Sequence, residues 1–167
     1  MEAFNLDERV EKAKRLFKEG GFNCCQAVVL AYNDILGLDD KVAASVASGF
    51  DGGMGRMREV CGSVSGMTLL AGLISPADDP NNKSGRTANY ALVQEMAEKF
   101  REINGSILCK ELLGLVPMGS ANNAPKESPE PSDRTPDYYK KRPCEELVGI
   151  SARIVGEKLL NMAHNVK

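Results

Sequence analysis

The residues in this sequence that could carry chemistry are four cysteines, each placed where a helix is expected to begin. Asn23 precedes the first, a glycine-rich turn precedes the second, Ser106 lies three residues before the third, and Pro143 directly precedes the fourth. Asn and Ser are preferred N-cap residues, and Pro favours helix starts. Free N–H groups and the helix dipole there stabilise negative charge, so such thiols should ionise more readily. The four are Cys24, Cys61, Cys109 and Cys144.

Two kinds of chemistry fit four such thiols, and the residues leave both open. Four thiolates can bind tetrahedral zinc or an iron–sulfur cluster, although the intervals of 36, 47 and 34 residues include no Cys-x-x-Cys pair. Thiol redox chemistry needs only two of the cysteines within disulfide reach. The fifth cysteine, Cys25, should point about 100° away from Cys24 on a helix and pack as a small hydrophobe. Simple packing is also the alternative for each of the four taken singly.

The loop before Cys61 predicts that this thiol is the most acidic of the four. Its glycines can turn backbone N–H groups inward, and Arg56 and Arg58 add positive charge nearby. Glu145 and Glu146 follow Cys144 directly and should raise the pKa of that thiol. We therefore expect Cys144 to be a ligand or a resolving thiol rather than the attacking one.

Several glycines and one arginine around Cys61 are candidates for contacting a small anion or a cofactor. The loop lacks both the Gly-Lys-Ser/Thr ending of a P-loop and the Rossmann glycine spacing, so it does not predict a nucleotide site. Small residues in the following helix would let a cofactor or another helix approach its backbone closely. The candidates are Gly52, Gly53, Gly55, Arg56, Gly62 and Gly66. The single histidine, His164, lies near the end of the sequence, so no Cys–His catalytic pair is expected.

Composition and charge narrow the classes of partner. A formal charge of -2 gives no broad electrostatic reason to expect nucleic acid or an anionic membrane. The longest charge-free apolar stretch, Val60 to Ile74, is shorter than the about 20 residues that a membrane-spanning helix needs. The acidic beginning of the sequence is unlike a signal peptide, so we expect a cytoplasmic protein. Permanent disulfides are uncommon there, which favours metal or redox roles for the cysteines.

Apolar spacing predicts a single all-α domain over residues 1–167, a bundle of about five to six helices after an N-terminal tail at residues 1–5. In the third helix we expect Val42, Val46 and Phe50 to face the core. The fifth helix should bury Tyr90, Val93, Ala97 and Phe100. The predicted helices begin or run at Asn5, Asn23 to about Leu36, Asp39 or Asp40, Cys61 to Ile74, Asn82 to Asn104, and Cys144, with a further short helix from Ser106 to Leu113.

Residues 114–143 are predicted to form a long irregular segment before the last helix. Six of the eight prolines fall there, among Asn, Ser, Asp and Lys. Irregular segments of this length in compact domains usually have a function or are disordered. Because Cys109 lies just before it and Cys144 just after it, we expect the segment to cover a site at the cysteines.

The motifs around these cysteines resemble the C_GCAxxG_C_C family, whose members are described as redox-active proteins. The resemblance rests on Gly21-Phe-Asn-Cys24-Cys-Gln-Ala-Val, on Gly52-Gly-Met-Gly-Arg before Cys61-Gly-Ser-Val-Ser-Gly66, on Cys109-Lys-Glu-Leu-Leu-Gly114 and on Cys144. It covers about Leu6 to Met162. Ser63 stands where the motif has alanine, and the family's four cysteines correspond to Cys24, Cys61, Cys109 and Cys144.

The resemblance implies a helical domain with a redox role, working with a redox or transport partner protein. Taken with the residues, it favours four convergent cysteines that form a thiol/disulfide site or a metal-thiolate site, with a metal ion or an iron–sulfur cluster as the cofactor in the second case. No Cys-x-x-Cys-His sequence for attaching haem is present. The alternative function is a helical module that binds a small molecule or a protein and in which the cysteines are structural.

Overall fold

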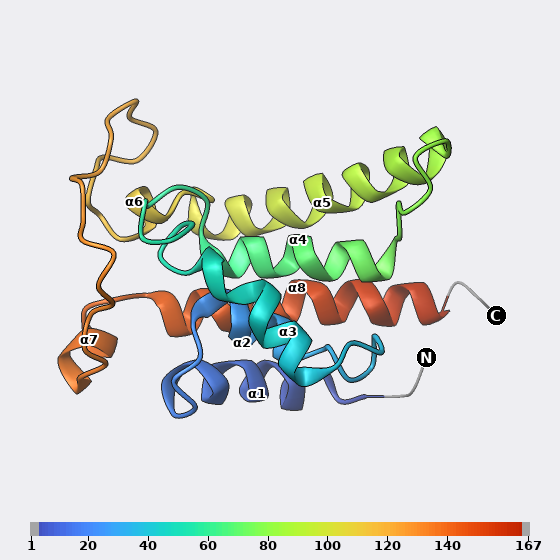
Figure 1. Cartoon of the computed structure of the whole chain (residues 1–167), viewed down its shortest axis with the longest axis horizontal. Coiled ribbons are helices and arrows are strands. Elements are labelled where there is room, and N and C mark those ends of the chain that lie inside the picture. Colours follow the sequence, from blue (N-terminus) through green and yellow to red (C-terminus); the bar gives the residue numbers. More distant parts are fainter. Residues whose placement is uncertain (1–3, 165–167) are drawn as a thin grey trace.

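The computed structural model describes residues 4–164, which contain eight α-helices and no strand (Figure 1). The all-α prediction is confirmed, but the number of helices exceeds five to six, and six of the eight have seven or more residues. The helices are α1 (Leu6–Lys18), α2 (Cys24–Leu30), α3 (Asp40–Ala47), α4 (Gly62–Ile74), α5 (Lys83–Asn104), α6 (Cys109–Leu112), α7 (Pro136–Lys140) and α8 (Cys144–His164), with the 3-10 turn η1 (Ser48–Phe50) after α3.

The short helix α2 lies at the centre and packs against α1, α3, α4 and α8. Six of its seven residues are buried, as expected of a helix that is apolar on all sides. A capping box begins it, in which Asn23 and Gln26 exchange side-chain to backbone hydrogen bonds of 2.8 and 3.0 Å. The helix ends at Leu30, earlier than predicted, and turns occupy residues 31–37.

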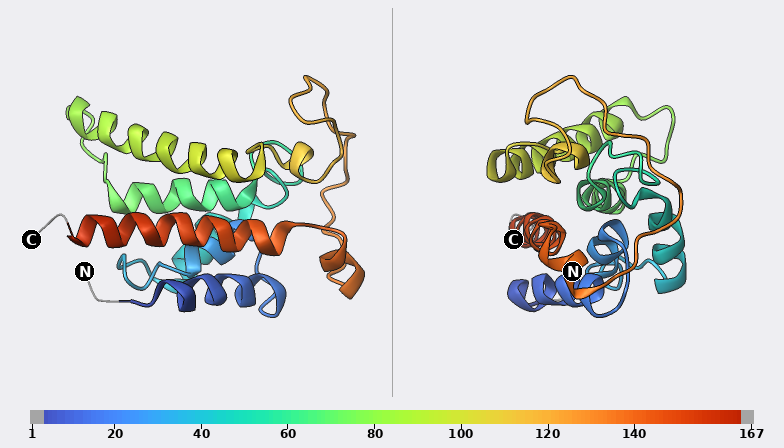
Figure 2. Two further views of the ribbon diagram at one scale, coloured as in Figure 1. Left: turned by 180° about the vertical axis from the view of Figure 1, so that it is seen from behind. Right: turned by 90° about the vertical axis from the view of Figure 1, so that its left-hand side faces the viewer.

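Three of the helices begin at the same end of the bundle. In Figure 1, α4 and α8 run side by side along the long axis, and α5 returns in the opposite direction on the outer side of α4. Figure 2 shows the same arrangement from behind, with α1 packed along α8. The starts of α2, α4 and α8 and the short helix α6 therefore meet at one end, drawn on the left in Figure 1.

Three residues that were predicted to face the core are exposed instead. In α3 the buried residues are Ala43 and Ala47, whereas Val42 and Val46 are 48% and 49% exposed. Small side chains let α3 lie close to α2, so the valines fall on the solvent side. In α5, Phe100 is buried and Val93 and Ala97 are half-buried against the core, as predicted, whereas Tyr90 is 61% exposed. The other buried residues of this helix are Leu92 and Met96.

The segment of residues 114–143 is more structured than predicted. It contains α7, which Thr135 caps by accepting a hydrogen bond from the Tyr138 N–H. The right-hand view of Figure 2 looks onto the end of the bundle where α8 starts and shows the segment running across it toward α7. The segment thus lies where a cover over that end would lie.

Two further expectations concern the beginning of the sequence and membranes. Residues 1–3 of the expected tail lie outside the described residues; Phe4 packs edge-on against Tyr32 with ring centroids 5.9 Å apart, and Asn5 caps α1. Between residues 4 and 164, none of the helices has the length and apolar character needed to cross a membrane.

Candidate functional site

One pocket at the end of the bundle is lined by all four of the cysteines that the sequence selected, Cys24, Cys61, Cys109 and Cys144. We call it the thiol pocket; it has a cavity volume of about 30 Å³. All four thiols are free, and three of these cysteines are buried while Cys144 is half-buried. Cys25 is fully buried but does not line the pocket, as its helical position predicted.

Each of the four lies at a helix start, as predicted. Cys24, Cys109 and Cys144 are the first residues of α2, α6 and α8, and Cys61 is the N-cap of α4. The residue that caps α6 is Leu108 rather than Ser106, which accepts a hydrogen bond from the Leu108 N–H at 3.0 Å.

Backbone pairing holds the chain before Cys61 beside the chain before Cys109. Val60 and Leu108 form an isolated antiparallel bridge. The Cys61 N–H donates to the Ile107 carbonyl at 2.8 Å, and the Cys109 N–H donates to the Glu59 carbonyl at 2.6 Å. Two cysteines that are separated by 47 intervening residues are thereby positioned by direct backbone contact.

The glycine-rich loop before Cys61 is wound in the left-handed region. Residues 52–56 all have positive φ, including the non-glycine residues Met54 and Arg56, and Arg58 follows with φ 62. Left-handed backbone costs a non-glycine residue about 1–2 kcal/mol, and such strain concentrates at functional sites. The N–H groups of residues 54–56 donate to carbonyls of residues 49–51. They therefore close the loop instead of pointing at Cys61 as we had expected.

Cys24 fits into a space that only glycine leaves open. A Cβ added at Gly62 would collide with the Cys24 Sγ and would lie 2.8 Å from the Phe50 carbonyl oxygen. The Cys24 thiol donates a hydrogen bond to the Asp51 carboxylate at 3.5 Å. Burial raises the pKa of Cys24 well above its ordinary value, and the negative charges of Cys61 and Asp51 raise it further.

Cys61 receives the hydrogen bonds of a helix start, but burial has the larger effect. Burial raises the pKa of the Cys61 thiol, whereas the Ser63 hydroxyl, 3.1 Å from the sulfur, and the N–H groups of Ser63 and Val64 lower it. The last two belong to the first turn of α4, so the predicted stabilisation of the thiolate is present. It does not bring the pKa below the ordinary value.

Cys109 is the thiol with an arginine beside it. Burial raises the pKa of Cys109 to about 11, and Arg58 opposes this rise because its Nη1 donates to the sulfur at 3.8 Å. Arg58 lines the same pocket as Cys61, in line with the prediction that it lies nearby, but the thiol that it contacts is Cys109. Lys110 N–H donates to the Arg58 carbonyl, so the same backbone pairing that positions Cys109 also positions the arginine.

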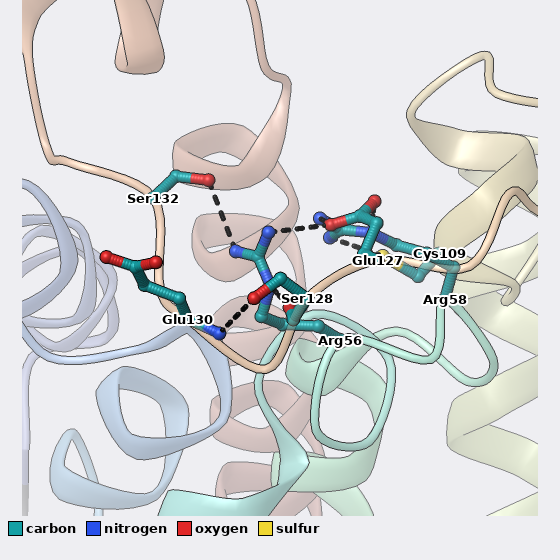
Figure 3. A network of polar contacts seen from close by, with 7 residues as sticks. All are labelled: Arg56, Arg58, Cys109, Glu127, Ser128, Glu130 and Ser132. Carbon is teal, nitrogen blue, oxygen red and sulfur yellow. Dashed lines mark hydrogen bonds and ion pairs between the residues drawn. The ribbon is translucent and has the colours of Figure 1, made fainter.

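The guanidinium of Arg58 is held by a carboxylate from the proline-rich segment. Arg58 Nε and Nη2 donate to the two oxygens of Glu127 at 2.7 and 2.6 Å, and Arg56 Nη2 donates to the same carboxylate at 2.8 Å (Figure 3). Arg56 also donates to the Ser128 carbonyl and to the Ser132 hydroxyl. Two arginines of the loop thus fasten residues 127–132 across the end of the bundle.

Cys144 is the most exposed of the four. Burial raises the pKa of Cys144 to about 12, and the charges of Cys61 and Cys109 raise it further while Arg142 opposes them. Glu145 and Glu146 point away to form ion pairs with Lys18 and Lys14. The pKa of Cys144 is therefore raised by burial and by the other thiols, and not by these two glutamates as we had expected.

The candidate glycines fall into two groups. Gly52, Gly62 and Arg56 line the thiol pocket, whereas Gly53, Gly55 and Gly66 do not. A Cβ at Gly53 would lie 2.7 Å from the Cys109 Cβ, and one at Gly66 would lie 2.9 Å from the Val28 Cβ. These two glycines permit close packing of the chain around the cysteines.

Sequence reasoning missed several residues of the pocket. Asp51, Ser63, Tyr138 and Arg142 line it, and Glu127 holds two of its arginines. A signal existed only for Ser63, two residues after Cys61 in the first turn of a helix. Asp51 comes from the loop, and Glu127, Tyr138 and Arg142 come from residues 114–143. No periodic sequence pattern predicts the path of that segment across the pocket.

Within residues 4–164, no group of three or more His, Cys, Asp or Glu side chains is arranged so that it could hold a metal ion. Four cysteine thiolates are nevertheless a full donor set for zinc or for an iron–sulfur cluster. For that use, the thiols lining the pocket would have to turn toward a common centre.

A helical bundle whose helix starts bring four free thiols to one pocket defines a cysteine-based all-α domain. The family model described as "Putative redox-active protein (C_GCAxxG_C_C)" matches residues 22–158, which include all four cysteines, and the chain belongs to this family. No curated protein and no solved structure matches the chain.

Proposed function

We propose that this chain is a thiol redox protein in which Cys61 and a second pocket cysteine cycle between two thiols and a disulfide. The observation that carries the proposal is that all four thiols line one pocket. Cys61 is electrostatically coupled to each of the other three, because its charge raises the pKa of Cys24, Cys109 and Cys144. The family description supports a redox role at this place in the chain.

The chemistry of the cycle is a two-electron exchange. Two cysteine thiols lose two electrons and two protons to an oxidised acceptor such as a disulfide, and a sulfur–sulfur bond forms between them. A reduced partner protein or small thiol then restores both thiols. The proline-rich segment, fastened through Glu127, would cover the pocket between these steps.

Mild oxidation followed by peptide mapping tests the proposal. The reduced protein is treated with a small disulfide, its remaining thiols are alkylated, and the linked peptides are identified by mass spectrometry. We expect one disulfide that includes Cys61, formed while the protein stays folded and reversed by a reductant. Five thiols that stay free after oxidation, or a disulfide that forms only on unfolding, would contradict it.

A metal-thiolate site is the second candidate, and it is favoured by the identity of the four pocket residues. Four cysteines complete the coordination of zinc or of an iron–sulfur cluster. Anaerobic purification, elemental analysis, an absorption spectrum and a thiol count distinguish the two candidates. Stoichiometric metal with four protected thiols would favour the metal site, and metal-free protein that forms a reversible disulfide would favour the thiol cycle.

A binding module with structural cysteines remains the alternative to both. It predicts that alanine at all four positions leaves ligand or partner binding intact. The redox proposal predicts that the same variant loses reversible oxidation.

A further inference from the structure

A second pocket adjoins the thiol pocket and leads away from it. This outer pocket, with a volume of about 360 Å³, lies between α7, the end of α6 and the segment that carries Glu127. The two pockets share four lining residues, Arg58, Leu113, Tyr138 and Arg142. A molecule in the outer pocket would therefore be separated from the thiols only by these side chains.

Arg142 stands on this shared wall without a carboxylate partner. Its guanidinium lies over the Tyr138 ring, 4.6 Å from the centroid. Among residues 4–164 its side chain forms no ion pair and no hydrogen bond, whereas Arg56 and Arg58 share Glu127. Guanidinium groups present a planar set of donors that suits a carboxylate or a phosphate.

Arg134 is a second cation at the same wall. Its guanidinium lies 5.1 Å from the ring centroids of both Phe17 and Tyr138, two residues that line the thiol pocket. Its Nη1 is buried and has no hydrogen-bond partner within the described part of the chain. A buried donor without a partner is destabilising, and a bound anion would supply that partner.

The charge around the two pockets is positive although the chain as a whole is negative, with a formal charge of -2. The residues that line the pockets include four cations, Arg56, Arg58, Lys141 and Arg142, and three carboxylates, Asp51, Glu127 and Asp137. Arg134 does not line either pocket, but it lies over the Tyr138 ring and adds a further positive charge nearby.

We propose that Arg142 binds the carboxylate of a small, negatively charged disulfide in the outer pocket while a sulfur of that disulfide reaches the thiol pocket, and that Arg134, packed on Tyr138, adds positive charge beside it. This inference rests on the proposed thiol redox function and names its substrate class. Opposite charge fixes the orientation of the substrate, so the cations select acidic disulfides over basic ones.

The exchange is balanced with the substrate as the oxidant. A pocket thiolate attacks one substrate sulfur, a mixed disulfide forms, and the other half of the substrate leaves as a thiolate that takes up a proton. A second pocket thiol then attacks the mixed disulfide and releases the remaining half as a thiol. Two cysteines are oxidised to one disulfide, and one substrate disulfide is reduced to two thiols.

Charge-matched substrates test the inference on the full chain. The reduced protein is mixed at low salt with oxidised glutathione, which is negatively charged, or with cystamine, which is positively charged, and the loss of protein thiols is followed. We expect oxidised glutathione to react roughly tenfold faster, as a field of this kind supports. Added salt should reduce the preference because it screens the charges.

Variants assign the preference to the two arginines. Arg142→Met and, separately, Arg134→Met should each lower the rate with oxidised glutathione at least about threefold while the rate with cystamine does not fall. Arg142→Lys should retain most of the preference. Lys140→Met is the matched control, because Lys140 is exposed and lines neither pocket. A preference that survives in both Met variants would overturn the assignment.

A non-reacting analogue separates this inference from the proposed function. S-methylglutathione keeps the carboxylates but cannot exchange, and calorimetry should detect its binding to wild type and a loss of binding in Arg142→Met. If both disulfides oxidise the protein equally fast and the analogue does not bind, the redox function stands and the anion subsite is overturned. If neither disulfide reacts but the analogue binds through Arg142, the subsite stands and the redox function is overturned.

Discussion

Arg58 and Glu127 form a bidentate ion pair that joins the glycine-rich loop to the proline-rich segment. The arginine side chain is 5% exposed and the carboxylate 24%, so water screens the pair only in part (Figure 3). The same guanidinium reaches the Cys109 sulfur. The position of the segment over the pocket and the charge beside a thiol are therefore coupled through one side chain.

Glu127→Gln should loosen the segment. The substitution replaces charge-assisted hydrogen bonds to Arg56 and Arg58 by neutral ones, and a loss of about 1–3 kcal/mol in the free energy of unfolding is expected. Limited proteolysis within residues 114–143 should become faster. Glu130→Gln is the control, because the Glu130 side chain is exposed and only its backbone N–H is bonded to Ser128. Equal proteolysis of the two variants would show that the ion pairs do not hold the segment.

Gly62→Ala should disrupt the pocket. The added methyl group would collide with the Cys24 sulfur and with the Phe50 carbonyl, and overpacking of this kind costs about 1–3 kcal/mol. Gly72→Ala in the same helix is the matched control, because a Cβ there meets nothing within 4 Å. That variant should be neutral or gain roughly 0.5–1 kcal/mol, since alanine favours helix. Urea denaturation of both proteins gives the comparison, and equal midpoints would contradict the prediction.

Arg58→Gln should make Cys109 less reactive. The arginine lowers the pKa of Cys109 against the effect of burial, so its removal leaves a smaller thiolate fraction and slower alkylation. Arg56→Gln is the control, because Arg56 binds Glu127 but donates to no thiol. Alkylation followed by peptide mass spectrometry reports Cys109 separately. Slowing of the same size in both variants would point to the segment rather than to the charge beside the sulfur.

The stability of the reduced protein should fall as the pH rises above the pKa of an ordinary thiol. Burial raises the pKa of Cys109 to about 11 and that of Cys144 to about 12, whereas an unfolded thiol ionises near about 8.5. Above the pKa of the unfolded thiol, the folded state therefore keeps protons that the unfolded state has lost. The stabilisation from the protonated thiols is fully present below that pKa, and it is lost as the pH rises toward 11 and 12. Urea midpoints between about pH 8 and 10 should decline, and less steeply in Cys144→Ser. An unchanged slope in that variant would assign the decline to other groups.

Cys25→Ala should keep the redox cycle. Cys25 is fully buried outside the thiol pocket, so its loss removes packing worth about 1 kcal/mol but no pocket thiol. Cys61→Ala should abolish reversible disulfide formation. Thiol counts before and after oxidation check both variants, and loss of the cycle in Cys25→Ala would require Cys25 in the disulfide.

Local sequence patterns selected four of the five cysteines as candidates and predicted that they lie at helix starts. Asn23 as a cap, Pro143 before Cys144 and the apolar α4 are signals that act over a few residues, so they can be found without a structure. The same patterns wrongly placed Val42, Val46 and Tyr90 in the core, because these residues continue an apolar stripe but packing left them in solvent. Helix periodicity predicts that a helix has an apolar face, but the packing of neighbouring helices decides which residues of that helix are buried.

Only the tertiary structure decided that the four helix starts meet at one pocket. It also decided that Arg58 donates a hydrogen bond to the Cys109 sulfur and that Glu127 binds both arginines of the loop. These contacts join segments tens of residues apart, and their geometry depends on how the helices pack. Burial, which is a property of the whole fold, raised the pKa of Cys24, Cys61 and Cys109, where the helix starts predicted lower values. The sequence thus selects the four cysteines, while the fold determines their environment because desolvation and long-range charge arise only when the chain is packed.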